Sequence, residues 1–258
     1  MTKDITTKVS DEALAILKES YPQETSFKRI ILPRISLVSQ DKTEGKGKSM
    51  KVIAEAGTFY LEEQTDEQDE NGRYIWKKTD LGKSIDGIIF YQRNQLRMFD
   101  SATEEFTSSP IYDDENEVVP LFKMRVQTDK GTPKELKAKF QYTDENGKVK
   151  SRLEDNRILY ILYDGKPYQM NLRGSSMYSF IAYARKTLVP SVLTTFSSTE
   201  EKKGQIEWNK MSFTVKSDLT EAEVGTVIAA MKDMKEMIAQ EKGQYVVAEK
   251  TEALDDFK

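Results

Sequence analysis

Five basic residues alternate with apolar residues on either side of an Asn146-Gly147 pair. Asn-Gly is typical of a type I′ turn, because both of its residues tolerate positive φ angles. The pattern therefore predicts a β-hairpin over residues 136–153, in which alternation along the strands gathers the cations on one face. Such a face is suited to neutralising phosphates. Its members are Lys137, Lys139, Lys148, Lys150 and Arg152.

Basic and aromatic residues also alternate in the sequence RYIWKK, which covers residues 73–78. In a strand, Tyr74, Trp76 and Lys78 share one face. Aromatic rings that stack on bases, beside cations that hold the backbone, bind single-stranded nucleic acid without regard to its sequence. Tyr91 and Arg93 extend the predicted surface, which makes these ten residues the candidate nucleic-acid-binding site. Further residues that could extend it are Arg97, Arg173, Tyr183, Arg185 and Lys186.

Carboxylates supply a candidate for catalysis. The PD-(D/E)xK nucleases use carboxylates to hold Mg²⁺ and a lysine to steady the attacking water. The residues that loosely match this pattern are Pro110, Asp113, Asp114, Glu135 and Lys137. Charged residues make up 32% of the chain, so chance matches are common. A magnesium-dependent nuclease is therefore the third function considered.

The chain has 258 residues and contains neither cysteine nor histidine. Disulfide frameworks, zinc fingers, cysteine nucleophiles and Ser-His-Asp catalysis are thereby excluded. We predict no catalytic residue, no metal ligand and no cofactor, and hence a protein that is not an enzyme. The lack of cysteine and of a long apolar segment favours the cytoplasm, that of the host cell if the protein is viral, without membrane contact.

The net charge of −4 is unevenly distributed. Residues 62–70 and 101–117 each carry −6, so the remainder of the chain carries +8. Both acidic segments are poor in aliphatic residues and are expected to be solvated loops. The basic remainder is compatible with a nucleic-acid partner.

The elements that position these residues are mostly strands. After a short helix expected at residues 11–20, strand-like runs separated by Gly, Asn and Asp dominate. One hairpin is expected to turn at Asp164-Gly165, and a later strand to cover residues 205–216. A helix is expected near 175–187. A longer helix opens with a capping box of Thr220 and Glu223, buries Val224, Val227, Ile228, Met231, Met234 and Ile238, and ends at Gly243.

The predicted fold is mainly β (α+β). It is an OB-like β-barrel or sandwich with a short N-terminal helix, the helix near 175–187 and the long C-terminal helix. The expected organisation is a helical segment at 1–22, one β-rich domain at 23–243 and a flexible acidic tail at 244–258.

The last residues of the chain place a phenylalanine beside two carboxylates, Asp255, Asp256 and Phe257. This tip resembles the C-termini of phage-type and bacterial single-stranded-DNA-binding proteins, which end in an acidic run with a terminal Phe. The resemblance implies that the tail captures replication proteins, although Lys258 here follows the Phe. The segments 87–90, 109–113, 120–122 and 174–178 are also similar to a group of phage-type proteins, which suggests a viral or mobile-element origin.

The leading hypothesis is a non-catalytic, sequence-tolerant single-stranded-DNA-binding protein of phage or mobile-element type that supports replication or recombination. A viral structural or assembly protein is the main alternative, because a β-rich chain with polar loops suits that role equally. DNA or RNA preference and homo-oligomerisation are left open by the sequence.

Overall fold

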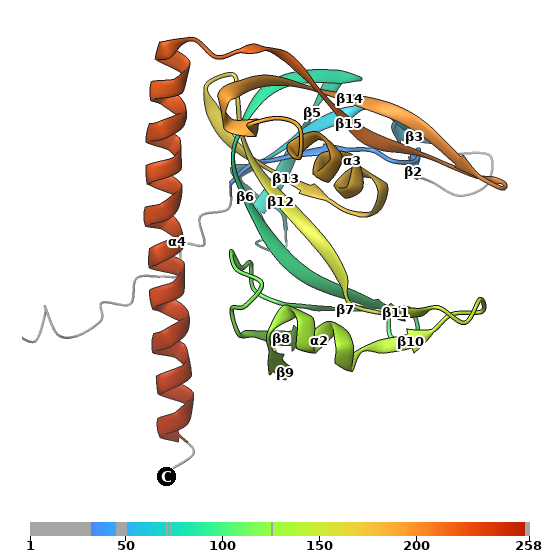
Figure 1. Ribbon diagram of the computed structural model, residues 1–258, viewed down its shortest axis with the longest axis vertical. Helices are drawn as coiled ribbons and strands as arrows, with labels where there is room; N and C mark the ends of the chain where they lie inside the picture. Colours follow the sequence, from blue (N-terminus) through green and yellow to red (C-terminus); the bar gives the residue numbers. More distant parts are fainter. Residues whose placement is uncertain (1–31, 45–50, 71, 73, 125, 256–258) are drawn as a thin grey trace, which may run out of the picture. The chain divides into compact units, whose positions relative to one another are not determined.

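The computed structural model describes residues 32–44, 51–70, 72, 74–124 and 126–255. Eleven strands form one sheet, whose order is β5-β4-β1-β13-β12-β6-β7-β8-β9, with β14 and β15 branching from β6 (Figure 1). Strands β1 and β13 run parallel, whereas the other described pairs of the sheet are antiparallel. The expected mainly β, α+β class is confirmed.

The strands of the sheet are β1 (Arg34–Leu37), β4 (Phe59–Gln68), β5 (Tyr74–Gly82), β6 (Ser84–Asp100), β7 (Glu105–Ser108), β8 (Val119–Lys123), β9 (Val126–Gly131), β12 (Glu154–Tyr163), β13 (Lys166–Leu172), β14 (Val192–Lys203) and β15 (Ile206–Asp218). Two small hairpins pair β2 (Lys42–Glu44) with β3 (Lys51–Ala54) and β10 (Gln141–Thr143) with β11 (Val149–Ser151). The helices are α2 (Pro133–Lys139), α3 (Gly174–Ala184), the 3₁₀ turn η2 (Val189–Ser191) and α4 (Glu221–Asp255).

The sheet remains open. Among the described strands, β5 and β9 end the strand order and do not pair with each other, so the expected closure into an OB-like barrel is not found. Strand β6 explains the difference, because its 17 residues pair with β12 along the middle and with β14 and β7 at opposite ends. A strand of this length joins two packing regions instead of closing one barrel.

The larger packing region lies between the sheet and α3, which contacts β15 (Figure 1). Met177 and Phe180 are buried on α3, as the apolar stripe of the predicted helix requires. The Phe213 ring lies 5.4 Å from that of Phe180 and 5.5 Å from that of Phe196, both in edge-to-face contact. Buried aromatic pairs of this geometry add about 1 kcal/mol beyond the area they bury.

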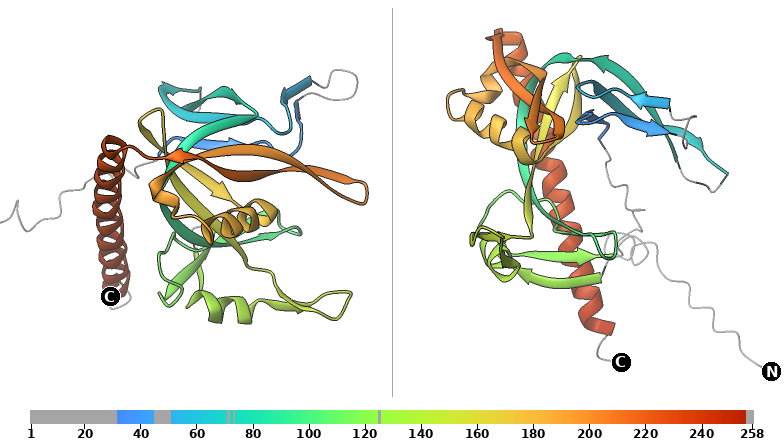
Figure 2. Two further views of the ribbon diagram at one scale, coloured as in Figure 1. Left: turned by 45° about the horizontal axis from the view of Figure 1, so that its top comes forward. Right: turned by 90° about the vertical axis from the view of Figure 1, so that its right-hand side faces the viewer.

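The smaller packing region lies at the β7 end of β6, where β8, β9 and α2 gather (Figure 2, green). Helix α2 covers residues that the sequence predicts as a strand. Its start is fixed by a capping box, in which the Glu135 carboxylate accepts from the Thr132 backbone N–H at 2.8 Å and Pro133 begins the helix. Leu136 is then buried against Tyr112 and Leu121. The strand predicted from residue 136 is therefore wrong over residues 136–139, and it begins only at Gln141, as β10.

The hairpin that follows has a different register from the predicted one. A two-residue turn at Asn146-Gly147 would pair Thr143 with Lys150. Instead Tyr142 pairs with Lys150 and Thr143 with Val149, which shifts the register by one residue. Gly147 has a φ of +74°, whereas Asn146 is not among the residues with positive φ. This geometry is a three-residue loop closed by a glycine bulge, not a type I′ turn. Asp144 favours it, because its carboxylate accepts from the backbone N–H groups of Asn146 and Lys148, both at 2.9 Å.

The hairpin of β12 and β13 matches its prediction. Asp164 and Gly165 have φ angles of +49° and +71°, and Tyr163 pairs with Lys166 directly across the turn. Both central residues therefore adopt the left-handed conformation that a type I′ turn requires. The strand expected at 205–216 is also confirmed, as β15.

Helix α4 begins at the predicted capping box, in which Glu223 accepts from the Thr220 backbone N–H at 2.7 Å. Val227, Met234 and Ile238 are buried and the helix contacts β6, but the predicted stripe members Val224 and Ile228 are exposed. The helix continues through Gly243, because one glycine costs only about 1 kcal/mol in a helix. None of the described helices is long and apolar enough to cross a membrane.

Part of the first acidic segment is a strand and not the expected loop. In β4, Glu62 pairs with Lys78 and Glu63 with Lys77 of β5. Opposite charges that face each other across two strands stabilise the pairing and offset the acidic composition. The helix expected at 11–20 lies outside the described residues.

The α2 capping box predicts a pH dependence. Hydrogen bonds from the Thr132 backbone and side chain hold the pKa of Glu135 below its ordinary value of 4.5. The stabilisation of α2 is therefore fully present above pH 4.5 and is lost as the pH falls through the lowered pKa. We expect the Thr132 amide NMR signal to titrate with a midpoint below 4.5, and Glu135→Gln to abolish that titration. A midpoint at or above 4.5 would contradict the box.

Candidate functional site

The five cations of the predicted hairpin do not form one face. Lys137 and Lys139 lie on α2 and pair with Asp155 and Asp129, each at 2.5 Å. Lys150 pairs with Asp144 at 2.7 Å, and this hydrogen bond holds the pKa of Lys150 above its ordinary value. The predicted phosphate-binding face is therefore wrong, because it assumed a strand where a helix forms.

The other two members of that set differ. Lys148 is exposed on the short hairpin. Arg152 is also exposed, with its guanidinium carbon 6.0 Å from the centre of the Tyr142 ring. Arg152 remains in the candidate site for a separate reason, its place in the pocket described below.

Arg93 is part of the interior. It is 2% exposed, with Nε 3.0 Å from Asp113 Oδ1 and a guanidinium nitrogen 3.0 Å from the Ile111 carbonyl oxygen. Its predicted contact with nucleic acid is wrong, because the side chain anchors the loop that follows β7. Tyr91 is half-buried, and its ring packs 6.3 Å from that of Tyr160.

Strand β5 keeps its predicted exposure. Tyr74 and Trp76 are 51% and 41% exposed, and the Lys78 Nζ lies 3.7 Å from a Glu62 carboxylate oxygen. Of the predicted partner-binding tail, Asp255 is the last residue of α4, whereas Asp256 and Phe257 lie outside the described residues. Capture of replication proteins by this tail stays a prediction.

The strand registers bring polar residues from seven strands onto one face of the sheet. Cross-strand partners point to the same side, and side chains alternate along each strand. Ile35, Leu61 and Met170 thus point into the larger packing region, and their neighbours in sequence point away from it. The same registers also place the buried Arg93, Ile158 and Tyr160 on the opposite side. We call the remaining polar residues and the exposed aromatic residues of that side the polar face. Its members are Trp76, Lys78, Glu62, Gln64, Arg34, Gln169, Asn171, Arg173, Glu154, Asn156, Gln95, Arg97, Phe99 and Phe106.

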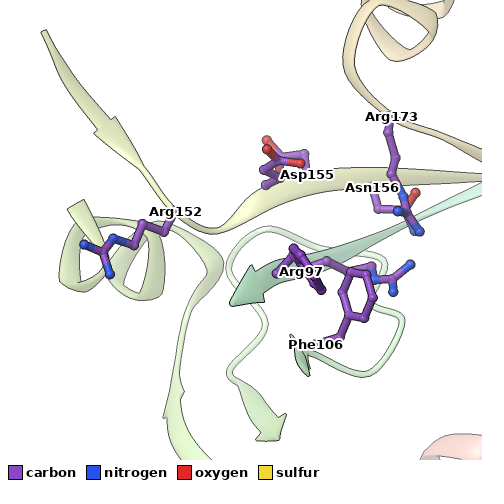
Figure 3. Close-up of a pocket in the computed structure, with 8 residues that line it drawn as sticks. Arg97, Phe106, Arg152, Asp155, Asn156 and Arg173 are labelled. Atoms are coloured by element: carbon purple, nitrogen blue, oxygen red, sulfur yellow. The ribbon is translucent and has the colours of Figure 1, made fainter. Parts of the chain in front are cut away.

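At the β7 end of this face lies a pocket of about 430 Å³, which we call the arginine pocket (Figure 3). Strands β6 and β7 supply Arg97 and two phenylalanines, and β12 supplies three polar residues. Arg152 comes from the turn between β11 and β12, and Arg173 directly follows β13. Its lining is Arg97, Phe99, Phe106, Arg152, Glu154, Asp155, Asn156 and Arg173.

Positive charge exceeds negative charge in the pocket. Within the described part of the chain, the guanidinium groups of Arg97, Arg152 and Arg173 form no ion pair. Of the two carboxylates in the lining, that of Asp155 is already paired with Lys137. An anion in the pocket would therefore meet three guanidinium groups that no carboxylate of the described residues neutralises.

The surroundings of Arg173 disfavour its positive charge. Burial of its guanidinium lowers the pKa of Arg173, and the positive charge of nearby Arg34 lowers it further. Arginine nevertheless stays protonated in proteins, so the positive charge of Arg34 continues to act on that of Arg173. An anion bound to Arg173 would offset this repulsion.

The pocket also has an aromatic wall. Phe99 and Phe106 are 53% and 46% exposed, with ring centres 4.8 Å apart. The Arg97 guanidinium carbon lies 4.4 Å above the Phe106 ring, within cation–π range. Large exposed apolar groups of this kind commonly mark a binding surface.

Comparisons with known proteins add no assignment. No protein family model, no curated protein sequence and no solved structure matches the chain. Among the described residues, no group of three or more acidic side chains is arranged to hold a metal ion. Glu135 and Asp113, two carboxylates of the nuclease pattern, are bound in the α2 capping box and to Arg93.

Of the pocket residues, Arg152 belongs to the ten-residue predicted site, and Arg97 and Arg173 are among the residues named as extensions of it; Phe99, Phe106, Glu154, Asp155 and Asn156 were not predicted. A signal for several of them exists in β6, where Arg93, Gln95, Arg97 and Phe99 recur at every second position. Such a polar and aromatic repeat of period two indicates one solvated face of a strand. The contributions of Asn156 and Arg173 depend on the pairing of β12 with β6 and β13, which no local pattern encodes.

Proposed function

We propose that the chain is a non-catalytic protein that binds single-stranded nucleic acid on its polar face, with little regard to sequence. The observation that carries the proposal is the arginine pocket, in which three arginines that form no ion pair with the described part of the chain lie beside two exposed phenylalanines. Arginines suit phosphates, and flat rings suit unpaired bases. A role in replication or recombination of a phage or mobile element follows as part of the same proposal.

The extent of the polar face supports an elongated ligand. From β5 to β7 it crosses seven strands, or about 29 Å at the usual strand spacing of ~4.8 Å. Trp76 and Lys78 lie at one end, and Phe99 and Phe106 at the other. An OB-like barrel is not needed, because an open sheet with aromatic residues on one face also binds single strands.

A titration of fluorescent oligo-dT at about 50 and 200 mM salt, with and without Mg²⁺, tests this function. If the three pocket arginines and Arg34 of the polar face each neutralise one phosphate, the slope of log affinity against log salt is about −2.8. We therefore expect binding to weaken about 50-fold over this fourfold salt range.

Three other outcomes have clear meanings. Absence of binding at low salt would overturn the proposal. Oligomers that form without nucleic acid, together with no binding, would favour the structural or assembly role. Cleavage of the strand in Mg²⁺ would favour the nuclease.

A further inference from the structure

Asn156 forms the floor of the arginine pocket and has one amide atom without a partner. The residue is 1% exposed, and its Nδ2 donates to Gln95 Oε1 at 3.2 Å. Its Oδ1 is buried and accepts no hydrogen bond from the described residues. An unsatisfied buried acceptor costs about 1–3 kcal/mol, so its retention calls for a reason.

The neighbouring contacts fix which amide atom is unpaired. Gln95 Nε2 donates to the carbonyl oxygen of Ser109 at 2.9 Å, and a carbonyl can only accept. Gln95 therefore presents its oxygen to Asn156, and Asn156 donates a hydrogen bond to it from Nδ2. These two hydrogen bonds leave Asn156 Oδ1 pointing away from Gln95, and no described residue donates to it.

The side chains around Asn156 can move. Arg173 reaches from the end of β13 toward Asn156, and Arg97 lines the same pocket with its guanidinium over the Phe106 ring (Figure 3). Arginine side chains have several rotatable bonds, and these two are not held by ion pairs among the described residues. A phosphate that draws the guanidinium groups outward would uncover Oδ1.

We propose that the arginine pocket takes up one unpaired base of the bound strand, and that an N–H group of this base donates a hydrogen bond to Asn156 Oδ1. The inference rests on the proposed function and names the part of the ligand that the pocket reads. Phe99 or Phe106 stacks on the base, while Arg97 and Arg173 hold the adjacent phosphates.

This contact selects single strands over duplexes. Each natural base carries at least one N–H group on its Watson–Crick edge, such as N3–H of thymine or the amino group of cytosine. In a duplex these groups are already donated to the opposite base. Asn156 therefore distinguishes unpaired from paired bases without distinguishing one sequence from another.

The test uses oligo-dT and the same oligomer built from N3-methylthymine, which keeps the charge and the ring but lacks the N–H group. We expect methylation to weaken binding to the unmodified protein about tenfold, the equivalent of one buried hydrogen bond. In Asn156→Leu, which has nearly the same shape, both oligomers should bind equally and with an unchanged salt slope. Asn94→Leu is the matched control, because Asn94 lies on β6 and faces the opposite side of the sheet.

The possible failures are distinguishable. Equal binding of both oligomers to the unmodified protein overturns the role of Asn156 and leaves the proposed function standing. A methylation effect that persists in Asn156→Leu overturns it as well. If neither oligomer binds to the unmodified protein, the proposed function itself fails.

Discussion

Replacing Arg97 and Arg173 together by serine is expected to weaken the binding of oligo-dT about 100-fold at about 50 mM salt. Each arginine removed deprives one phosphate of a charge-assisted hydrogen bond, worth roughly 1.5 kcal/mol or more. Two fewer neutralised phosphates also reduce the salt slope by about 1.4. Fluorescence titrations at several salt concentrations measure both quantities.

A change of net charge alone must be separated from loss of the pocket. Lys166→Ser with Lys186→Ser removes the same charge from exposed positions at the far end of β13 and beyond α3. This double variant should bind within a fewfold of the unmodified protein. Equal losses in the two double variants would show that binding follows overall charge, and the arginine pocket would lose its assigned role.

Replacing Arg93 by methionine is expected to lower the free energy of unfolding by about 3 kcal/mol while leaving the salt slope of binding unchanged. The substitution removes a 2%-exposed cation that contacts Asp113 and the Ile111 carbonyl oxygen, so both acceptors lose a donor. Methionine fills much of the space but supplies no N–H group. Urea unfolding measures the loss.

Lys134→Met serves as the comparison, because Lys134 is exposed on the first turn of α2 and should change stability by less than about 0.5 kcal/mol. A stable Arg93→Met variant with weakened binding would restore Arg93 to the interface predicted from the sequence. The reverse result, instability with intact binding at low temperature, assigns the side chain to the interior.

Sequence patterns predicted correctly the elements that are determined by residues next to one another in the chain. The hairpin turn expected at Asp164-Gly165 formed, with type I′ geometry, whereas Asn146-Gly147, for which type I′ was predicted, formed a bulged loop of another type. The difference lies in Asp144, whose carboxylate accepts two backbone N–H groups and holds the earlier residues in a helical turn. A dipeptide signal is thus overridden by a side chain two positions upstream.

The sequence contains a start signal for helix α2, but the alternating pattern that follows favoured a strand. Thr132, Pro133 and Glu135 spell a capping box with proline at the first helical position. The alternation of basic and apolar residues from 136 onward favoured a strand over these seven residues. Because residues two apart share a face in a strand but not in a helix, this error also placed Lys137 and Lys139 on a binding surface that does not form.

The candidate site was only partly predictable because its residues come together through long-range pairing. Trp76 and Lys78 were identified from alternation within one strand. Arg173 and Asn156 join them only because β13 and β12 pair between β1 and β6. Burial is equally non-local, since nothing in the sequence around Arg93 distinguishes it from the accessible Arg97.

The length of β6 has a consequence for how the protein opens. Strand β6 enters both hydrophobic clusters, and the arginine pocket lies at its β7 end, next to Leu96 of the smaller cluster, whereas the other end of the polar face lies on strands of the larger cluster. Regions between cooperative units open at lower free energy than the units themselves. A ligand that spans this boundary would suppress the opening by mass action and join the two units into one. Slowed amide exchange in β7 and α2 would then report occupancy of the pocket.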